Sequence, residues 1–175
     1  IKILYSFEYP QKGVPQRTYL TLSNRQIIMK YCFVILIFFS VTLDVRAQES
    51  SMQVAKALLD AGNYDASLEA FNTIEKENKT NPSFYFFRGT CLSEMGLNER
   101  AITDLSVSIS LDQSNAECYY QRGFSFFSIG NSENAIQDFD QAIILDPEYG
   151  EAYLNRGTIN YQLEKLDSAC KDWQA

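Results

Sequence analysis

The stretch AECYYQRGFSFFSIGNSENAIQDFDQAIILDPEY, residues 116–149, decides the fold of this chain of 175 residues. It predicts two helices, over residues 117–129 and 133–145. Gly130 lies where the first helix ends, because glycine adopts the left-handed conformation of a helix C-terminus without a steric penalty. One such helix pair cannot bury its apolar face alone, so its stability is expected to be shared with neighbouring pairs.

The same pattern recurs on both sides of this stretch with a period of 34 residues. The dipeptides that keep this spacing are Arg88-Gly89, Arg122-Gly123 and Arg156-Gly157, and also Ala101-Ile102 and Ala135-Ile136. Residues 48–175 are therefore predicted to form an array of repeats that begin at Gln48, Pro82, Ala116 and Gly150, the last one incomplete. The other predicted helices cover residues 49–61, 65–77, 83–95, 99–111, 151–163 and 167 onward.

Three glycines fall inside predicted helices, where glycine costs about 1 kcal/mol relative to alanine. They are Gly89, Gly123 and Gly157, all in one phase of the repeat. A cost that recurs at one phase indicates close contact with the opposite helix, and Ala101, Ala135 and Ala169 are expected at the approach. Large side chains are expected to fill the space between layers, namely Phe71, Leu105, Phe139 and Trp173.

Eight residues of the third repeat stand at spacings that mark a known family: Tyr119, Gly123, Phe126, Gly130, Ala135, Phe139, Ala142 and Pro147. In these residues, and over residues 48–175, the chain resembles the tetratricopeptide repeat (TPR) family. Ala55, Ser67 and Glu164 depart from the family pattern, at a helix glycine, a helix alanine and a turn glycine. The resemblance implies an all-α solenoid of antiparallel helix pairs that forms a right-handed superhelix.

The resemblance also implies a concave groove, lined by the first helix of each repeat, that binds a protein or peptide. The groove residues that it implies are Phe86, Tyr120, Gln121, Phe124, Asn155 and Tyr161, accompanied by Gln53, Lys56, Thr90, Glu117, Phe127, Glu151, Leu154 and Thr158. Only Lys56 and Asn155 could serve in the cluster with which some TPR domains hold a C-terminal carboxylate. The groove is instead expected to take a peptide with apolar anchors. The alternative is that its aromatic residues only pack between repeats.

Each of three arginines is followed by an aspartate sixteen residues later. The pairs are Arg88 with Asp104, Arg122 with Asp138 and Arg156 with Asp172. The first repeat lacks both members together, with Val54 and Ala70 in their places. Joint presence and absence predicts a structural bridge between the two helices of a repeat, which we favour over a functional role for the arginine.

The first 47 residues differ in character from the rest and have the organisation of an export signal. Met29-Lys30 gives a positive start, Tyr31 to Leu43 is an apolar run, and a cut after Ala47 suits a signal peptidase. This predicts a signal peptide over residues 29–47 and no stable membrane span once it is removed. An uncleaved anchor or a buried core helix are the alternatives. Residues 1–28 are expected to be a non-native upstream extension or a disordered leader.

Composition excludes several classes of function. Residues 48–175 hold nine basic and twenty acidic side chains, a net charge of −11, so a nucleic acid is not an expected partner. The sequence contains no histidine, which removes the commonest general base and metal ligand. Three cysteines follow the predicted signal, Cys91, Cys118 and Cys170, without zinc-site spacing, and are expected to pack in helices. No catalytic residue, metal or cofactor is predicted, and the chain is not expected to be an enzyme.

These observations predict an exported TPR protein, periplasmic or extracellular, that acts as an adaptor or assembly scaffold. Two alternatives stay open at this point. The array could be the docking segment of a larger protein whose enzymatic or signalling activity lies beyond residue 175. It could also carry a small molecule or lipid in an aromatic groove, which a closed apolar pocket would favour.

Overall fold

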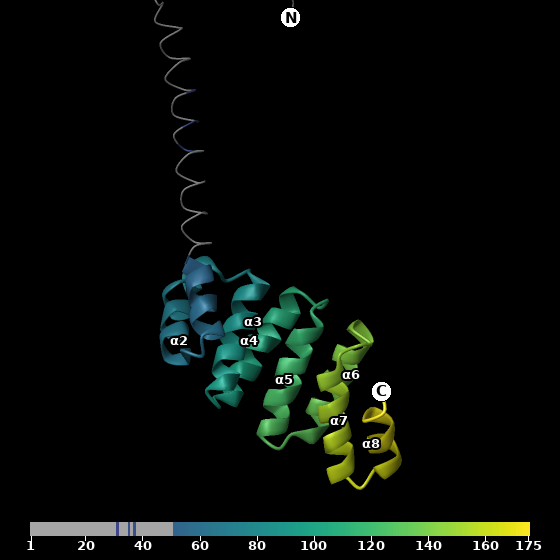
Figure 1. Cartoon of the computed structure of the whole chain (residues 1–175). Helices are drawn as coiled ribbons and strands as arrows, with labels where there is room; N and C mark the ends of the chain where they lie inside the picture. Colours follow the sequence, from purple (N-terminus) through teal and green to yellow (C-terminus); the bar gives the residue numbers. More distant parts are fainter. Residues whose placement is uncertain (1–30, 32–34, 36, 38–50) are drawn as a thin grey trace, which may run out of the picture. The chain divides into compact units, whose positions relative to one another are not determined.

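The computed structural model describes residues 31, 35, 37 and 51–175 (Figure 1). The chain divides into two compact units, Ile1–Asp44 and Val45–Ala175, and the elements below belong to the second. The predicted leader, residues 1–28, lies outside the described residues, as does most of the predicted signal peptide, residues 29–47. No helix in the described part of the chain is both long and apolar enough to span a membrane.

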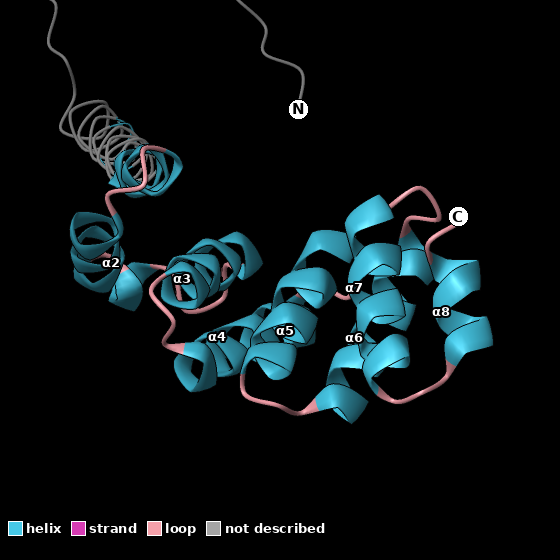
Figure 2. Cartoon of the chain, turned by 60° about the horizontal axis from the view of Figure 1, so that its bottom comes forward, coloured by secondary structure: helices cyan, strands magenta, loops and turns pink. Residues whose placement is uncertain are grey.

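All regular structure among the described residues is helical, as the sequence predicts (Figure 2). Residues 51–60 are helical and precede α2 (Tyr64–Thr73) and a 3-10 turn (Glu75–Glu77). The helices that follow are α3 (Pro82–Glu94), α4 (Asn98–Leu111), α5 (Ala116–Ser128), α6 (Ser132–Leu145), α7 (Gly150–Gln162) and α8 (Leu166–Asp172).

The helices form antiparallel pairs that stack along the chain. We call residues 51–60, α3, α5 and α7 the A helices, and α2, α4, α6 and α8 the B helices. The B helices α4, α6 and α8 pack on the A helices of their own pairs, and α2, α4 and α6 also pack on the next A helix, α3, α5 and α7. In the first pair, the Ser67 hydroxyl of α2 donates to the Ala55 carbonyl oxygen at 2.8 Å. The A helices α3 and α5 contact each other directly. The A helices thus lie next to one another along the stack, which is the arrangement of a helical solenoid.

The turns within pairs follow the sequence. Gly62, Gly96 and Gly130 adopt positive φ angles of 73°, 73° and 81° after their A helices. Glu164 stands at the equivalent turn between α7 and α8 and adopts the same conformation, with φ of 60°. A side chain in this conformation costs about 1–2 kcal/mol, so the last turn carries strain that the other turns avoid.

The prediction of a helix over residues 65–77 is wrong at its C-terminal end, because α2 stops at Thr73. The last turn of α4 contains Ile109, which is 8% exposed, whereas the first repeat has Glu75 in that phase. A glutamate cannot be buried there without a large desolvation cost. The chain instead forms the short 3-10 turn, and the Asn78 side chain donates a hydrogen bond to the carbonyl oxygen of Ile74 at 2.8 Å.

The mid-helix glycines allow close approach of the B helices, but their neighbours differ from the prediction. A Cβ atom on Gly89 would lie 2.7 Å from Cγ of Leu105, and one on Gly123 would lie 3.0 Å from a ring carbon of Phe139. Ala101, Ala135 and Ala169 are buried, yet none is among the nearest atoms at these glycines. Leu105 and Phe139 are fully buried, whereas Trp173, in the same phase, is 48% exposed.

Substitution of Gly89 by alanine is expected to lower the free energy of unfolding by about 1–2 kcal/mol, because overpacking against buried Leu105 exceeds the gain in helix propensity. Gly150→Ala is the matched control. A Cβ on Gly150, the first residue of α7, would meet no atom within 4 Å, so the free energy of unfolding should not fall. Urea unfolding, monitored by circular dichroism, measures the free energy of unfolding of both variants. Equal effects of the two changes would contradict the close-approach argument.

Candidate functional site

One stripe of the A helices carries the residues implied for partner binding, and we call it the helix-A face. Side chains three or four residues apart on a helix share one face. On α5 the stripe consists of Glu117, Tyr120, Gln121, Phe124 and Phe127, and on α7 of Glu151, Leu154, Asn155, Thr158 and Tyr161.

Tyr120 and Asn155 join the two stripes. The Asn155 side-chain Nδ2 donates a hydrogen bond to the Tyr120 hydroxyl at 3.1 Å. The Tyr120 ring also packs against Phe139 and Tyr149, with ring centroids 5.8 Å and 5.0 Å away. Burial raises the pKa of Tyr120, which the hydrogen bond from Asn155 partly offsets. These contacts fix the relative position of α5 and α7, so they form a rigid base for the face.

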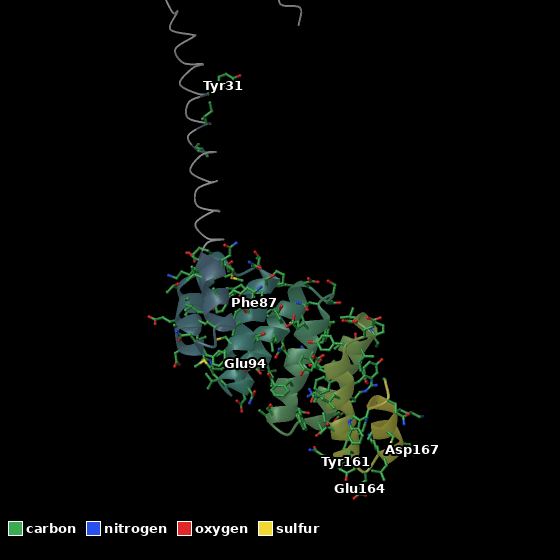
Figure 3. The ribbon with its side chains drawn as sticks, in the orientation of Figure 1. Tyr31, Phe87, Glu94, Tyr161, Glu164 and Asp167 are labelled. Carbon is green, nitrogen blue, oxygen red and sulfur yellow. The ribbon has the colours of Figure 1, made fainter. Side chains whose placement is uncertain are left out.

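Three side chains of the face are apolar and open to solvent. Phe124 is 39% exposed, and Leu154 and Tyr161 are each 57% exposed. Trp173, directly after α8, extends this row, since its Nε1 donates a weak hydrogen bond to the carbonyl oxygen of Leu154 at 3.4 Å. Its ring centroid lies 5.8 Å from that of Tyr161, which is near the turn into α8 (Figure 3). The row therefore offers apolar and aromatic contacts along α5 and α7.

The structure does not support Phe86 as a residue of the binding face. Phe86 is 6% exposed and belongs to a core cluster with Leu105 and Cys118. Residues 86, 120 and 154 occupy one phase of the repeat, yet their side chains change from buried to half-buried to exposed along the stack. The prediction for Phe86 is wrong because phase alone does not set how deeply a neighbouring helix pair covers a side chain.

Sequence reasoning missed Phe87, which lies beside Phe86. Phe87 is half-buried, and the Lys56 ammonium lies 4.7 Å from the centroid of its ring. This residue has the same phase as Gln121 and Asn155, which the sequence did assign to the face, so the period could have found it. Gln121 is half-buried on α5.

The structure brings each of the three predicted arginine–aspartate pairs together. Two guanidinium nitrogens of each arginine, Nε and Nη2, donate to the carboxylate, at 2.7 and 2.9 Å for Arg88–Asp104 and at 2.8 and 2.7 Å for Arg122–Asp138. The distances are 3.2 and 2.6 Å for Arg156–Asp172. Bidentate geometry of this kind gives a strong, directional ion pair between α3 and α4, α5 and α6, and α7 and α8.

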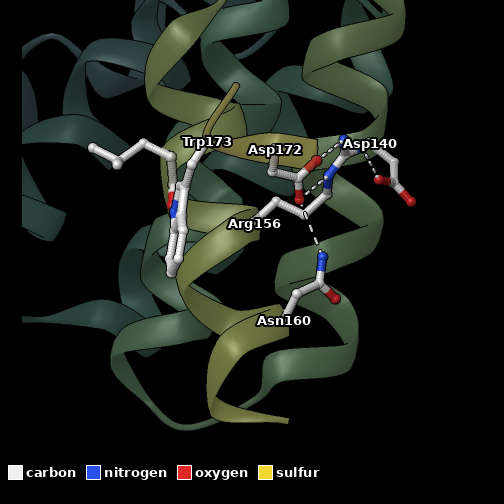
Figure 4. Close-up of polar contacts among 6 residues, drawn as sticks. Asp140, Arg156, Asn160, Asp172 and Trp173 are labelled. Atoms are coloured by element: carbon white, nitrogen blue, oxygen red, sulfur yellow. Dashed lines mark hydrogen bonds and ion pairs between the residues drawn. The ribbon is translucent and has the colours of Figure 1, made fainter. Parts of the chain in front are cut away.

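The remaining nitrogen of each arginine reaches the preceding helix pair. Nη1 of Arg88 lies 3.3 Å from Glu75 Oε1. Nη1 of Arg122 donates to Ser106 Oγ at 3.1 Å, and Nη1 of Arg156 donates to Asp140 Oδ1 at 2.6 Å. Figure 4 shows Arg156 between Asp172 and Asp140, with Asn160 donating to Asp172 Oδ2 at 3.1 Å. Arg122 and Arg156 thus each connect two consecutive B helices, and Arg88 connects α4 to the 3-10 turn after α2. The sequence did not predict this role.

The comparisons with known proteins agree with this geometry. Two family models described as tetratricopeptide repeat match the chain, over residues 54–116 and 116–149. The chain belongs to the tetratricopeptide-repeat family. A search of curated proteins finds no match to it.

Solved TPR structures share the fold of this chain. The crystal structure of MamA has a TM-score of 0.70 and 21% identity, over 89% of this chain and 92% of MamA. MamA from Desulfovibrio magneticus RS-1 has a TM-score of 0.69 and 20% identity, over 73% of this chain and 72% of that one. The first TPR of Spaghetti (RPAP3), bound to the HSP90 peptide SRMEEVD, has a TM-score of 0.64 and 20% identity, over 67% of this chain and 93% of that one.

Two hollows in the TPR array adjoin the bridging arginines. One of about 420 Å³ is lined by Ile136, Asp140, Tyr153, Arg156, Asn160, Ser168, Lys171 and Asp172. The other, of about 290 Å³, is lined by Asn72, Glu75, Arg88, Leu92, Arg100, Thr103 and Asp104. Both are open to solvent and lined mainly by polar and charged residues, and Arg88 and Arg156 within them already bind carboxylates. They are sites where helix pairs are joined, and neither resembles a closed apolar pocket.

The cysteines of the TPR array are free thiols. Cys91 and Cys118 are fully buried, and burial raises the pKa of both, to about 11 for Cys118. They are therefore protonated and unreactive near neutral pH. Cys170 is exposed on α8, contrary to the expectation that it packs. Within the described residues, no three acidic or cysteine side chains are placed to hold a metal ion.

Substitution of Arg122 by alanine is expected to lower the free energy of unfolding by about 3–5 kcal/mol, because Asp138 is left buried and unpaired. The Asp138 side chain is only 6% exposed. Arg100→Ala, at an exposed arginine of α4, is the control and should change the value by about 0.5 kcal/mol or less. Unfolding in a chemical denaturant measures the free energy of unfolding of both variants. An Arg122→Ala protein of unchanged stability that no longer bound its partner would show that the arginine is functional.

Proposed function

We propose that the TPR array binds a protein partner by holding an extended or helical peptide segment on the helix-A face. The observation that carries this proposal is the exposed row of Phe124, Leu154 and Tyr161 on a base made rigid by the Tyr120–Asn155 hydrogen bond. Exposed apolar side chains in contact with a rigid base supply affinity without a large cost of ordering the site. The biochemical role is that of an adaptor or assembly scaffold.

Similarity in fold to the first TPR of Spaghetti (RPAP3) supports peptide binding as the mode of interaction, since that domain is bound to an HSP90 peptide. The chemistry of the peptide must differ. Lys56 and Asn155 are the two residues here that could join a carboxylate clamp. Lys56 lies against the Phe87 ring, and Asn155 donates to Tyr120. Apolar anchors are therefore the main source of affinity in the proposal.

We further propose that α7 and α8 are a fourth repeat and that the chain is exported after removal of residues 29–47. The Arg156–Asp172 pair and the Glu164 turn support the fourth repeat, because they stand in the phases of the other pairs. The export proposal rests on the sequence of residues 29–47. We propose no reaction, and the polar character of the two hollows does not favour a lipid carrier.

Phe124→Ala is expected to weaken binding of selected peptides at least about tenfold, the equivalent of about 1.4 kcal/mol, because an apolar anchor loses its contact. The peptides come from a random 12-residue library selected on the full chain, and fluorescence anisotropy measures their affinity. The melting temperature should change little, since Phe124 is 39% exposed.

Ile144→Ala is the matched control, because Ile144 is 67% exposed on the B helix α6. It should leave peptide affinity unchanged. Tyr120→Ala should lower both affinity and melting temperature, since its ring and hydroxyl join α5 to α7. Loss of peptide affinity in Ile144→Ala, or unchanged peptide affinity in Phe124→Ala, would show that peptides bind elsewhere than on the helix-A face.

Export is checked by the intact mass of the protein recovered from the exported fraction of its native cells. The expected mass is that of a chain beginning at Gln48, because a signal peptidase prefers small residues before the cut, as at Ala47. A protein that retains residues 29–47 in the membrane fraction would show an uncleaved anchor instead. A protein found only in the cytoplasm would contradict export.

A further inference from the structure

We infer that the peptide held on the helix-A face carries lysine or arginine side chains beside its apolar anchors. This inference rests on the proposed function and specifies the class of partner. It depends on which charges of the A helices are already paired and which face solvent.

The uncompensated charges of α3, α5 and α7 are all acidic. Helices α3, α5 and α7 contain three arginines and no lysine. All three arginines are bound to aspartates of the B helices. The remaining charged residues of these helices are Glu94, Glu117 and Glu151, and all three are exposed. Glu94 accepts a long hydrogen bond of 3.4 Å from the Tyr64 hydroxyl, which does not neutralise it.

Glu117 and Glu151 stand on the same stripes as the apolar row. Glu117 is three residues before Tyr120 and seven before Phe124, and Glu151 is three residues before Leu154. Both positions therefore lie on the face that presents the anchors, within one or two helical turns of them. A peptide that covers Phe124 and Leu154 passes next to both carboxylates.

Both carboxylates act on the Tyr149 ring, and Glu151 acts on the Tyr120 ring as well. Burial raises the pKa of Tyr149, and the negative charges of Glu117 and Glu151 raise it further. Glu151 also raises the pKa of Tyr120, after burial, and the Tyr120 and Tyr149 rings are 5.0 Å apart. The negative potential is thus concentrated where the α5 and α7 stripes meet, beside the exposed anchors.

The basic residue implied for this face, Lys56, is on another part of the stack from these two carboxylates. It lies on the helical segment 51–60, with its ammonium 4.7 Å from the ring centroid of Phe87 on α3, whereas Glu117 and Glu151 lie on α5 and α7. Residues 48–175 carry a net charge of −11, so long-range attraction adds to the local effect. An acidic peptide would be repelled, whereas a basic peptide pairs with Glu117 and Glu151 while its apolar side chains cover Phe124 and Leu154.

The test selects a random 12-residue peptide library on the full 175-residue chain and on its Glu117→Gln/Glu151→Gln variant. Peptides whose binding requires Phe124 are sequenced. Lysine and arginine should be enriched about threefold or more over the unselected library with the natural chain, and this enrichment should disappear with the variant. The control, Glu69→Gln/Glu133→Gln, removes the same charge from exposed sites on α2 and α6 and should keep the enrichment.

A second measurement uses the tightest peptide and a copy in which each basic residue is replaced by glutamate. At 50 mM salt the natural peptide should bind about tenfold or more tightly than the copy, and at 300 mM salt the difference should shrink because exposed charges are screened. The inference would be overturned if the natural peptide and its glutamate copy bound equally, if acidic peptides were selected, or if the control variant lost the enrichment. Each of these results would still be compatible with peptide binding on the helix-A face. If no selected peptide depends on Phe124, the proposed function fails as well.

Discussion

The arginine–aspartate pairs are the interaction on which the rest of the stack depends. Each guanidinium holds the B helix of its own pair through two hydrogen bonds and reaches the preceding helix pair or the turn after it through a third nitrogen, as Arg122 does with Asp138 and Ser106. A buried ion pair stabilises only when its remaining donors are also satisfied. Because the third partner belongs to the neighbouring helix pair, satisfying the arginine requires the neighbour to be in place. Stability is therefore shared along the stack.

The ends of the stack show what happens when these constraints change. The first helix pair has no arginine, and its B helix stops at Thr73, where Glu75 replaces an apolar residue and binds Arg88 of the next pair instead. At the other end, Glu164 adopts the left-handed conformation that glycine takes elsewhere, and Trp173 is half exposed where Phe139 is buried. The two outer pairs thus depart from the pattern that the inner pairs keep.

The same pairing also shapes the surface proposed for partner binding. It engages every arginine of α3, α5 and α7 with the B helices, so the charges that these three helices leave free are carboxylates, beside Phe124, Leu154 and Tyr161. Tyr120 and Asn155 hold α5 and α7 in register beneath this row. One set of ion pairs therefore stabilises the scaffold and leaves a face that is apolar and acidic, which is suited to a basic, apolar peptide.

The sequence by itself determined the period, the order of the helices, the left-handed turns at Gly96 and Gly130 and the pairing of arginine with aspartate. These follow from local backbone preferences and from side chains that recur in one phase. Only the tertiary structure decided exposure. Phe86, Tyr120 and Leu154 share a phase, yet they are buried, half-buried and exposed, because each depends on how the next helix pair covers it. The sequence did not predict the third partner of each arginine for the same reason. A repeat period describes one helix pair at a time, whereas contacts between helix pairs depend on how the pairs pack in space.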